Sequence, residues 1–145
     1  EGGENPAAEV EDLREMMQEK VGIIRTGKLL KEALKDLDEL EARAALTCPG
    51  GSRIYNPGWH QALELGAMID VSRMCALAAL EREESRGGHT RDDFPIPDHS
   101  HWGKVNSVIS LSGDGSMKIE HRSYPPIDEE FKALLDADDL HEEEA

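Results

Sequence analysis

The most apolar segment of the chain contains no internal proline up to Arg86. It follows Asn56-Pro57, a pair typical of a helix start, because asparagine can cap free amides and proline fits the first helical position. No further proline occurs before Arg86, so we expect a helix of roughly 45 Å that stops at the glycines after it. Between Leu63 and Leu80 apolar residues occupy almost every side of this helix. The pattern predicts that the other segments surround it.

Two amphipathic segments precede this helix. The first begins at Asn5-Pro6 and carries apolar residues at intervals of three or four, which predicts one buried helix face. Thr26 is the expected cap of the second, and Cys48 to Gly51 should end it. The outer face of the second segment mixes both signs of charge, a pattern typical of a solvated surface. The inner positions are Val10, Leu13, Met17, Val21 and Ile24 in the first segment, and Leu29, Ala33, Leu37, Leu40 and Ala44 in the second.

The pattern changes from a helical to a strand period after Pro97. β-branched residues from Val105 to Leu111, a turn signal at Gly113–Gly115 and alternation from Met117 to Tyr124 predict a β-hairpin. A lone hairpin is marginal in water, so it should pack against the helices or a neighbour. The predicted fold class is therefore mainly α: an antiparallel three-helix bundle with a C-terminal β-hairpin and a short terminal helix.

Four parts are expected along the chain. Residues 1–5 should be a disordered lead-in, and residues 6–103 the three-helix bundle with the polar segment that follows it. Residues 104–127 form the hairpin extension. Asp128 can cap the short helix of residues 128–145, whose end is an acidic tail.

Composition narrows the classes of partner. The formal net charge of -15 over 145 residues argues against nucleic acid and against an anionic membrane surface. No run of 18 uncharged apolar residues occurs, so direct membrane insertion is not expected, and no signal peptide is recognised before the first helix. Cys48 and Cys75 form neither a disulfide framework nor a zinc set, and Cys75 should be a small core residue. The two cysteines favour a reducing, cytosolic setting. Because the sequence begins at Glu1 without methionine, we expect a piece of a longer chain.

The polar segment from Glu81 to His101 allows three interpretations. A metal site would draw on its histidines and aspartates, although their spacing matches no common metal motif. Acid–base catalysis would use His89 with Asp92 or Asp93, but the helices offer no obvious pocket. A structural junction, in which arginines pair with carboxylates and with free helix-end carbonyls, is favoured on physical grounds. The candidate metal ligands are His89, Asp92, Asp93, Asp98, His99 and His101.

Residues 84–95 read E-S-R-G-G-H-T-R-D-D-F-P and are followed by Asp98 and Trp102. They resemble the E-S-R-G-A-H-x-R-x-D-F/Y-P…D…W signature of the flavoprotein subunits of succinate dehydrogenase and fumarate reductase. V-G-I-I-R-T-G at residues 21–27 and L-E-L-G at residues 63–66 are similar to two further segments of that family. L-aspartate oxidases share a related C-terminal domain and stay an alternative. The stretch D-H-S-H-W at residues 98–102 departs from the family's usual D-D-x-N-W.

The resemblance implies a C-terminal helical domain that acts as a scaffold and docking surface. The family's flavin, dicarboxylate and proton-delivery residues lie in FAD-binding and capping domains outside this chain, and no G-x-G-x-x-G occurs here. We therefore expect no catalytic, cofactor-binding or metal residue in this chain, and no activity from it alone. The residues that the resemblance marks as a structural or interdomain signature are Arg25, Glu84, Ser85, Arg86, His89, Arg91, Asp92, Asp98 and Trp102.

The complete parent would interconvert succinate and fumarate with FAD and pass electrons to an iron–sulfur subunit. Its partners would be the FAD-binding domain of the same chain and that iron–sulfur subunit. The parent complex would hold it in the cytoplasm, peripheral to the inner face of the cell membrane. Two other classes stay open: a free-standing acidic three-helix interaction module without a redox role, and a small metal enzyme.

Overall fold

The computed structural model describes residues 5–132 of the chain, and most of them form helices with one small antiparallel hairpin. Of the predicted lead-in at residues 1–5, residues 1–4 lie outside the described residues, as do most of the predicted terminal helix and tail, whereas Asn5 caps α1. The elements are α1 (Pro6–Lys20), β1 (Ile24–Arg25), α2 (Gly27–Ala44), α3 (Pro57–Glu81), β2 (Thr90–Arg91), the 3-10 helix η1 (Trp102–Lys104), β3 (Val105–Leu111) and β4 (Met117–Ser123).

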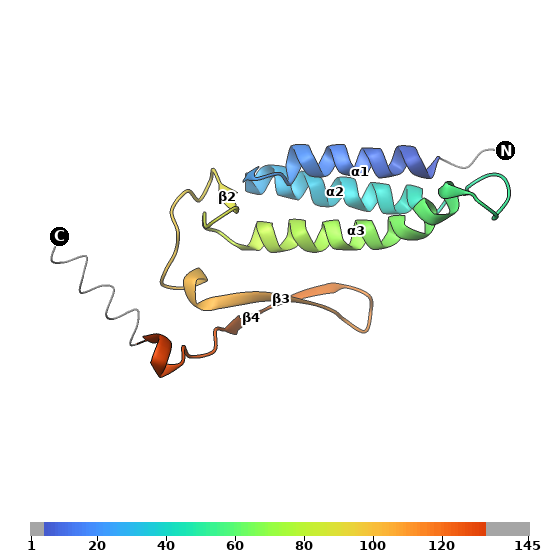
Figure 1. Ribbon diagram of the computed structural model, residues 1–145. Coiled ribbons are helices and arrows are strands. Elements are labelled where there is room, and N and C mark those ends of the chain that lie inside the picture. The colour runs from blue at the N-terminus through green and yellow to red at the C-terminus, as the bar shows by residue number, and fades with distance from the viewer. Residues whose placement is uncertain (1–4, 133–145) are drawn as a thin grey trace.

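The three α-helices lie side by side, each running opposite to the one before it, and each contacts the other two (Figure 1). The hairpin of β3 and β4 extends beside α3. β1 and β2, which are far apart in the sequence, pair in parallel at the end of the helices where α3 finishes. No helix within residues 5–132 is long and apolar enough to cross a bilayer.

Side-chain caps set the predicted helix starts, which are confirmed. The Asn5 carboxamide oxygen accepts from the Ala7 N–H at 3.0 Å, and that of Asn56 accepts from the Gly58 N–H at 3.0 Å. Pro6 and Pro57 follow these caps, where the missing N–H leaves no helical hydrogen bond unmade. At the start of α2, Thr26 Oγ1 accepts from the Leu29 N–H at 3.2 Å. These local signals fix where each helix enters the fold.

The core lies between the inner faces of α1, α2 and α3. Ala33, Leu37, Leu40 and the neighbouring Leu30 form the buried stripe of α2, whereas Leu29 is only half-buried. Burial of these aliphatic side chains is the main stabilising contribution available to the chain. The full set of buried apolar core residues is Val10, Leu13, Val21, Leu30, Ala33, Leu37, Leu40, Leu65, Ile69, Ala76 and Ala79.

The first helix is shorter than its apolar spacing predicts. α1 ends at Lys20, and Ile24, expected on the inner stripe, is 64% exposed in β1. Strand pairing competes with the helix here, because the Thr90 N–H donates to the Ile23 carbonyl and the Asp92 N–H to the Arg25 carbonyl. Extending α1 through this segment would remove both bonds.

The predictions for α3 are wrong in two respects. The helix ends at Glu81 rather than near Arg86, and its outer side is uncovered, with Leu63 71% and Val71 59% exposed. Cys75, expected in the core, is also exposed. Only one side of α3 meets α1 and α2, and the hairpin makes few contacts with it, so apolar residues on the other side stay in solvent.

The predicted hairpin is confirmed. β3 and β4 pair in antiparallel register from Val105 opposite Ser123 to Leu111 opposite Met117. Gly115 has a φ of 86°, a conformation that favours glycine, and it lies in the turn that joins the strands. The register places residues 107, 109, 119 and 121 on one face, which brings His121 within 3.2 Å of the Glu81 carboxylate.

Candidate functional site

The C-terminal end of α3 is closed by a buried arginine of the polar segment. The backbone leaves the helix at Arg82, whose ψ is 98°. Arg91, only 1% exposed, donates through Nη1 to the carbonyl oxygens of Ala79 at 2.8 Å, Leu80 at 3.0 Å and Arg82 at 3.3 Å. Helix-end carbonyls have no partner within the helix, so this guanidinium replaces the missing hydrogen bonds.

Arg91 also connects this end of α3 to the start of α2. Its Nε and Nη2 donate to the two Asp93 oxygens at 2.8 Å each, in the bidentate geometry that strengthens such pairs. Asp93 additionally accepts from the Gly27 N–H at 2.8 Å. The Arg91 guanidinium beside it holds the pKa of Asp93 well below its ordinary value. Two helices are therefore joined through one ion pair.

Gly27 leaves little room for a side chain beside this ion pair. A Cβ there would lie 3.0 Å from an Asp93 carboxylate oxygen and 3.2 Å from Arg91 Nη2. We expect Gly27→Ala to lower the free energy of unfolding by about 1–3 kcal/mol, measured by urea denaturation. Gly66→Ala in α3 is the matched control, since a Cβ there meets open space. It should stabilise by roughly 0.5–1 kcal/mol, and equal effects at both sites would contradict the packing.

Glu84 is the centre of a second buried ion-pair group. Its side chain is fully buried and accepts from Arg82, from Arg86 Nε and Nη2 at 3.1 Å each, and from the Asp98 N–H at 2.8 Å. Burial alone would raise the pKa of Glu84, but the hydrogen bonds from Arg86, Asp98 and Arg82 outweigh it and lower that pKa. Arg86 also donates to the Asp98 carbonyl at 3.3 Å. Arg91, and not Arg86, satisfies the helix-end carbonyls.

Arg82 attaches the hairpin to the end of α3. It donates to the Trp102 carbonyl at 3.3 Å and to the Val105 carbonyl at 3.2 Å, and its guanidinium lies 5.2 Å from the centre of the Trp102 ring. Trp102 is 8% exposed. Its ring centroid lies 4.8 Å from that of His101 and 4.9 Å from that of His121, and both ring pairs are T-shaped. One arginine therefore holds the start of β3 in place.

His89 and Arg25 form the third contact of this region. Arg25 Nη1 lies 2.7 Å from His89 Nδ1, and His89 Nε2 lies 3.1 Å from the Arg82 carbonyl oxygen. Since arginine only donates, His89 Nδ1 must accept and Nε2 must carry the proton. Burial lowers the pKa of His89, and the neighbouring guanidinium groups of Arg25, Arg91 and Arg82 lower it further. Neutral imidazole therefore joins β1 to the end of α3.

The remaining signature residues contribute through turns and the backbone. Ser85 Oγ accepts from the Arg91 N–H at 2.8 Å and lies 2.9 Å from the Phe94 carbonyl, to which it can donate. Asp98 Oδ1 accepts from Ser100 and from the His101 N–H, which lowers the pKa of Asp98. Asp92 is exposed, and its backbone N–H donates to the Arg25 carbonyl oxygen.

Sequence reasoning left Arg82 and Asp93 out of the signature set. Arg82 lies within the predicted helix, yet it and Arg86 both bind Glu84 from positions two residues away. Side chains two positions apart do not face each other on a helix, so these contacts form only because the backbone is extended after Glu81. Asp93, and not Asp92, occupies the aspartate position of the signature R-x-D-F/Y-P, so the motif itself contained this signal.

Three titratable side chains at this end of α3 are held by fixed contacts. Glu84 and Asp93 are held as carboxylates by arginines, and His89 has both ring nitrogens engaged. Among the residues that the structure describes, no group of three or more His, Cys, Asp or Glu side chains could hold a metal ion. The chemistry of this region is that of a fixed network, which we call the junction and define as Arg25, Arg82, Glu84, Arg86, His89, Arg91 and Asp93.

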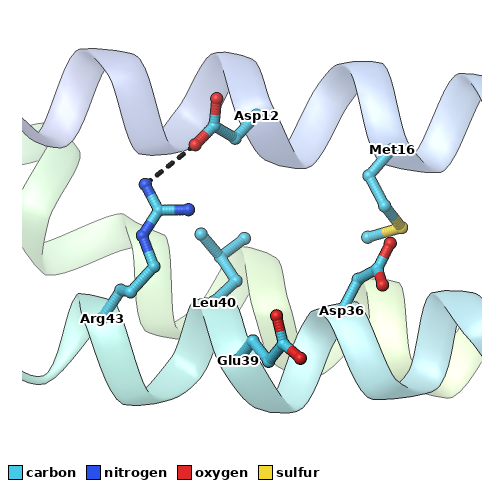
Figure 2. A pocket seen from close by; sticks show the side chains of 6 residues that line it. All are labelled: Asp12, Met16, Asp36, Glu39, Leu40 and Arg43. Carbon is cyan, nitrogen blue, oxygen red and sulfur yellow. Dashed lines mark hydrogen bonds and ion pairs between the residues drawn. The ribbon is translucent and has the colours of Figure 1, made fainter.

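A hollow between α1 and α2 lies away from the junction. It has a volume of about 230 Å³ and is bridged by an Arg43–Asp12 ion pair at 2.8 Å (Figure 2). Asp36 on its wall is paired with Lys20 at 2.5 Å. Exposed ion pairs of this kind contribute little to stability, and the hollow contains no convergent set of donors. Its lining residues are Asp12, Met16, Asp36, Glu39, Leu40 and Arg43.

Comparison with known proteins gives consistent results. The family model "Fumarate reductase flavoprotein C-term" matches residues 10–133. The fumarate reductase flavoprotein subunit of Helicobacter pylori is 41% identical over 103 residues, which are 70% of this chain and 14% of that protein. The succinate dehydrogenase flavoprotein subunit of Coxiella burnetii is 34% identical over 134 residues, covering 90% of this chain and 21% of that protein. The chain therefore spans about a fifth or less of these relatives.

A solved structure agrees with the sequence relatives. That of Mycobacterium smegmatis Sdh1 in complex with UQ1 has a TM-score of 0.80 and 40% identity, over 85% of this chain and 21% of the other. Fold and junction together define a mostly helical domain of the flavoprotein subunits of succinate dehydrogenase and fumarate reductase. The chain belongs to the family of fumarate reductase flavoprotein C-terminal domains. These matches favour this family over L-aspartate oxidase.

Proposed function

We propose that this chain is the C-terminal scaffold and docking domain of a flavoprotein subunit that interconverts succinate and fumarate with FAD. The observation that carries the proposal is the family match over residues 10–133 in a chain that spans so small a part of its relatives. The antiparallel three-helix bundle of residues 6–103 would be the folded body, and the hairpin of residues 104–127 its extension. The junction would hold these parts together rather than carry out a reaction.

The uncovered side of α3 supports the docking role. Leu63, Val71 and Met74 leave an apolar surface along this helix, and Ile23 and Ile24 extend exposed apolar area near its end. Adjacent exposed apolar residues on a folded protein are typical of an interaction surface. The proposed occupant is the FAD-binding domain of the same chain, which would complete the burial that the all-round apolar pattern of α3 predicts.

The parent would pass its electrons to an iron–sulfur subunit, as the resemblance implies. It would lie in the cytoplasm, peripheral to the inner face of the cell membrane, and membrane attachment would come from other subunits. The coding sequence upstream of residue 1 tests this assignment. It should encode an FAD-binding domain with G-x-G-x-x-G, and a gene that begins near residue 1 would favour a free-standing acidic module instead.

The chain alone should be catalytically silent. We expect the purified 145-residue chain to carry no bound flavin and to reduce no dye when succinate is added, because the family's flavin and dicarboxylate residues lie elsewhere. Visible absorbance and dye reduction measure the two properties. The matched control is the full-length parent, purified and assayed in the same way. Succinate-dependent turnover by the chain alone would refute the scaffold role.

A further inference from the structure

A pocket beside the junction lies between β1, the C-terminal half of α3 and strand β3. It has a volume of about 390 Å³. No carboxylate lines it, although the formal net charge of the chain is -15. The pocket is lined by Arg25, Cys75, Ala78, Ala79, Arg82, His89, Asn106 and Ser107.

Arg25, on the pocket wall, has unused hydrogen-bonding capacity. Arg25 donates through Nε to the Val21 and Gly22 carbonyls and through Nη1 to His89, but within residues 5–132 its Nη2 has no partner. A guanidinium N–H that faces a pocket can donate to the oxygen acceptors of a ligand.

The electrostatics select one class of ligand. The charged groups facing His89 are the guanidinium groups of Arg25, Arg82 and Arg91. Burial is the largest cause of the lowered pKa of His89, and the positive field of these three groups lowers it further. Arg82 and Arg91 are already paired with Glu84 and Asp93, which leaves Arg25 as the one of these three cations with no carboxylate partner among residues 5–132. One unpaired guanidinium matches the single charge and planar oxygens of a carboxylate.

We propose that this pocket binds a carboxylate group, which accepts from Arg25 Nη2. The carboxylate is that of a free acid or that of an Asp or Glu side chain on an adjoining polypeptide. The site lies wholly within this chain and so does not depend on the proposed function.

Titration of the 145-residue chain with acetate, followed by NMR of the His89 ring, tests the proposal at constant ionic strength. Acetate should bind saturably and raise the pKa of His89, because a carboxylate nearby stabilises the imidazolium. Arg25→Gln should weaken acetate binding about tenfold. The matched control is Arg53→Gln, whose guanidinium lies over Trp59 near the start of α3, and it should bind like the native chain. Absence of saturable binding, or equal loss in both variants, would overturn the proposal.

Asn106→Asp provides a second test that does not remove any junction contact. The change is nearly isosteric and places a carboxylate on the pocket wall. It should raise the pKa of His89 without acetate and weaken acetate binding, whereas an unchanged pKa together with native acetate affinity would count against the site. Acetate binding in the full-length parent identifies the source: undiminished binding indicates a free acid, and blocked binding indicates a side chain from the adjoining polypeptide.

Discussion

Replacing Arg91 with alanine should lower the free energy of unfolding by about 2–5 kcal/mol, because each buried acceptor left without a donor costs roughly 1–3 kcal/mol. The guanidinium is 1% exposed and donates to three carbonyls at the end of α3 and to both Asp93 oxygens. Alanine would leave the carbonyls without donors and Asp93 without its cation. Urea denaturation followed by circular dichroism measures the loss.

Two matched variants separate this effect from a general loss of charge. Arg91→Lys should restore only part of the stability, because an ammonium cannot reproduce the planar, forked set of donors. Arg14→Ala should change the free energy of unfolding by less than about 1 kcal/mol, since its ion pair with Glu11 is exposed. A loss of unfolding free energy in Arg91→Ala as small as that in Arg14→Ala would contradict the structural role of the junction.

The same ion pair gives a pH signature. Because the pKa of Asp93 is lowered in the folded chain, its stabilising contribution is complete above the unfolded pKa of about 3.9 and is lost as the pH falls below that value. The Arg91→Ala variant should lose less stability over the same acid range than the native chain does.

Ile69→Ala should lower the free energy of unfolding by about 2–5 kcal/mol. Ile69 is 1% exposed on the inner side of α3, where the neighbouring helices cannot fully close the cavity that the smaller side chain leaves. Leu63→Ala on the same helix is the control, since Leu63 is 71% exposed and its loss leaves no cavity. Urea midpoints that shift equally would show that both sides of α3 are buried alike.

Local signals in the sequence were sufficient for much of the fold. The Asn-Pro pairs and Thr26 locate helix starts, since a cap depends only on residues two or three positions away. The hairpin follows from β-branched residues before Gly113–Gly115 and alternation after it, with those glycines in a short connection. The positions of Ala33, Leu37 and Leu40 give the buried face of α2 through the helical period alone.

Long-range contacts account for the errors. Nothing near Ile24 indicates that its partner is Thr90, so α1 was expected to continue where β1 begins. The end of α3 depends on Arg91 and on Glu84, which draws Arg82 and Arg86 to the same carboxylate. Such pairings are set by the tertiary structure and leave little trace in hydrophobic periodicity.

The exposed side of α3 has a different explanation. The pattern from Leu63 to Leu80 indicates a helix that is buried all round, whereas this chain buries one side of it. Sequence patterns reflect the complete protein in which the helix functions. An adjoining domain over Val71 and Met74 would reconcile the pattern with the structure.

Turnover per bound flavin in a full-length subunit carrying Arg86→Ala tests the central claim most directly. Arg86 binds Glu84 and the Asp98 carbonyl and lies at the surface of the junction, so the variant should still assemble in part. We expect lower assembly or flavin content with native turnover for each flavin that remains. Native stability and flavin content with turnover abolished would show that Arg86 reaches the chemistry, and would contradict a junction that serves only as a scaffold.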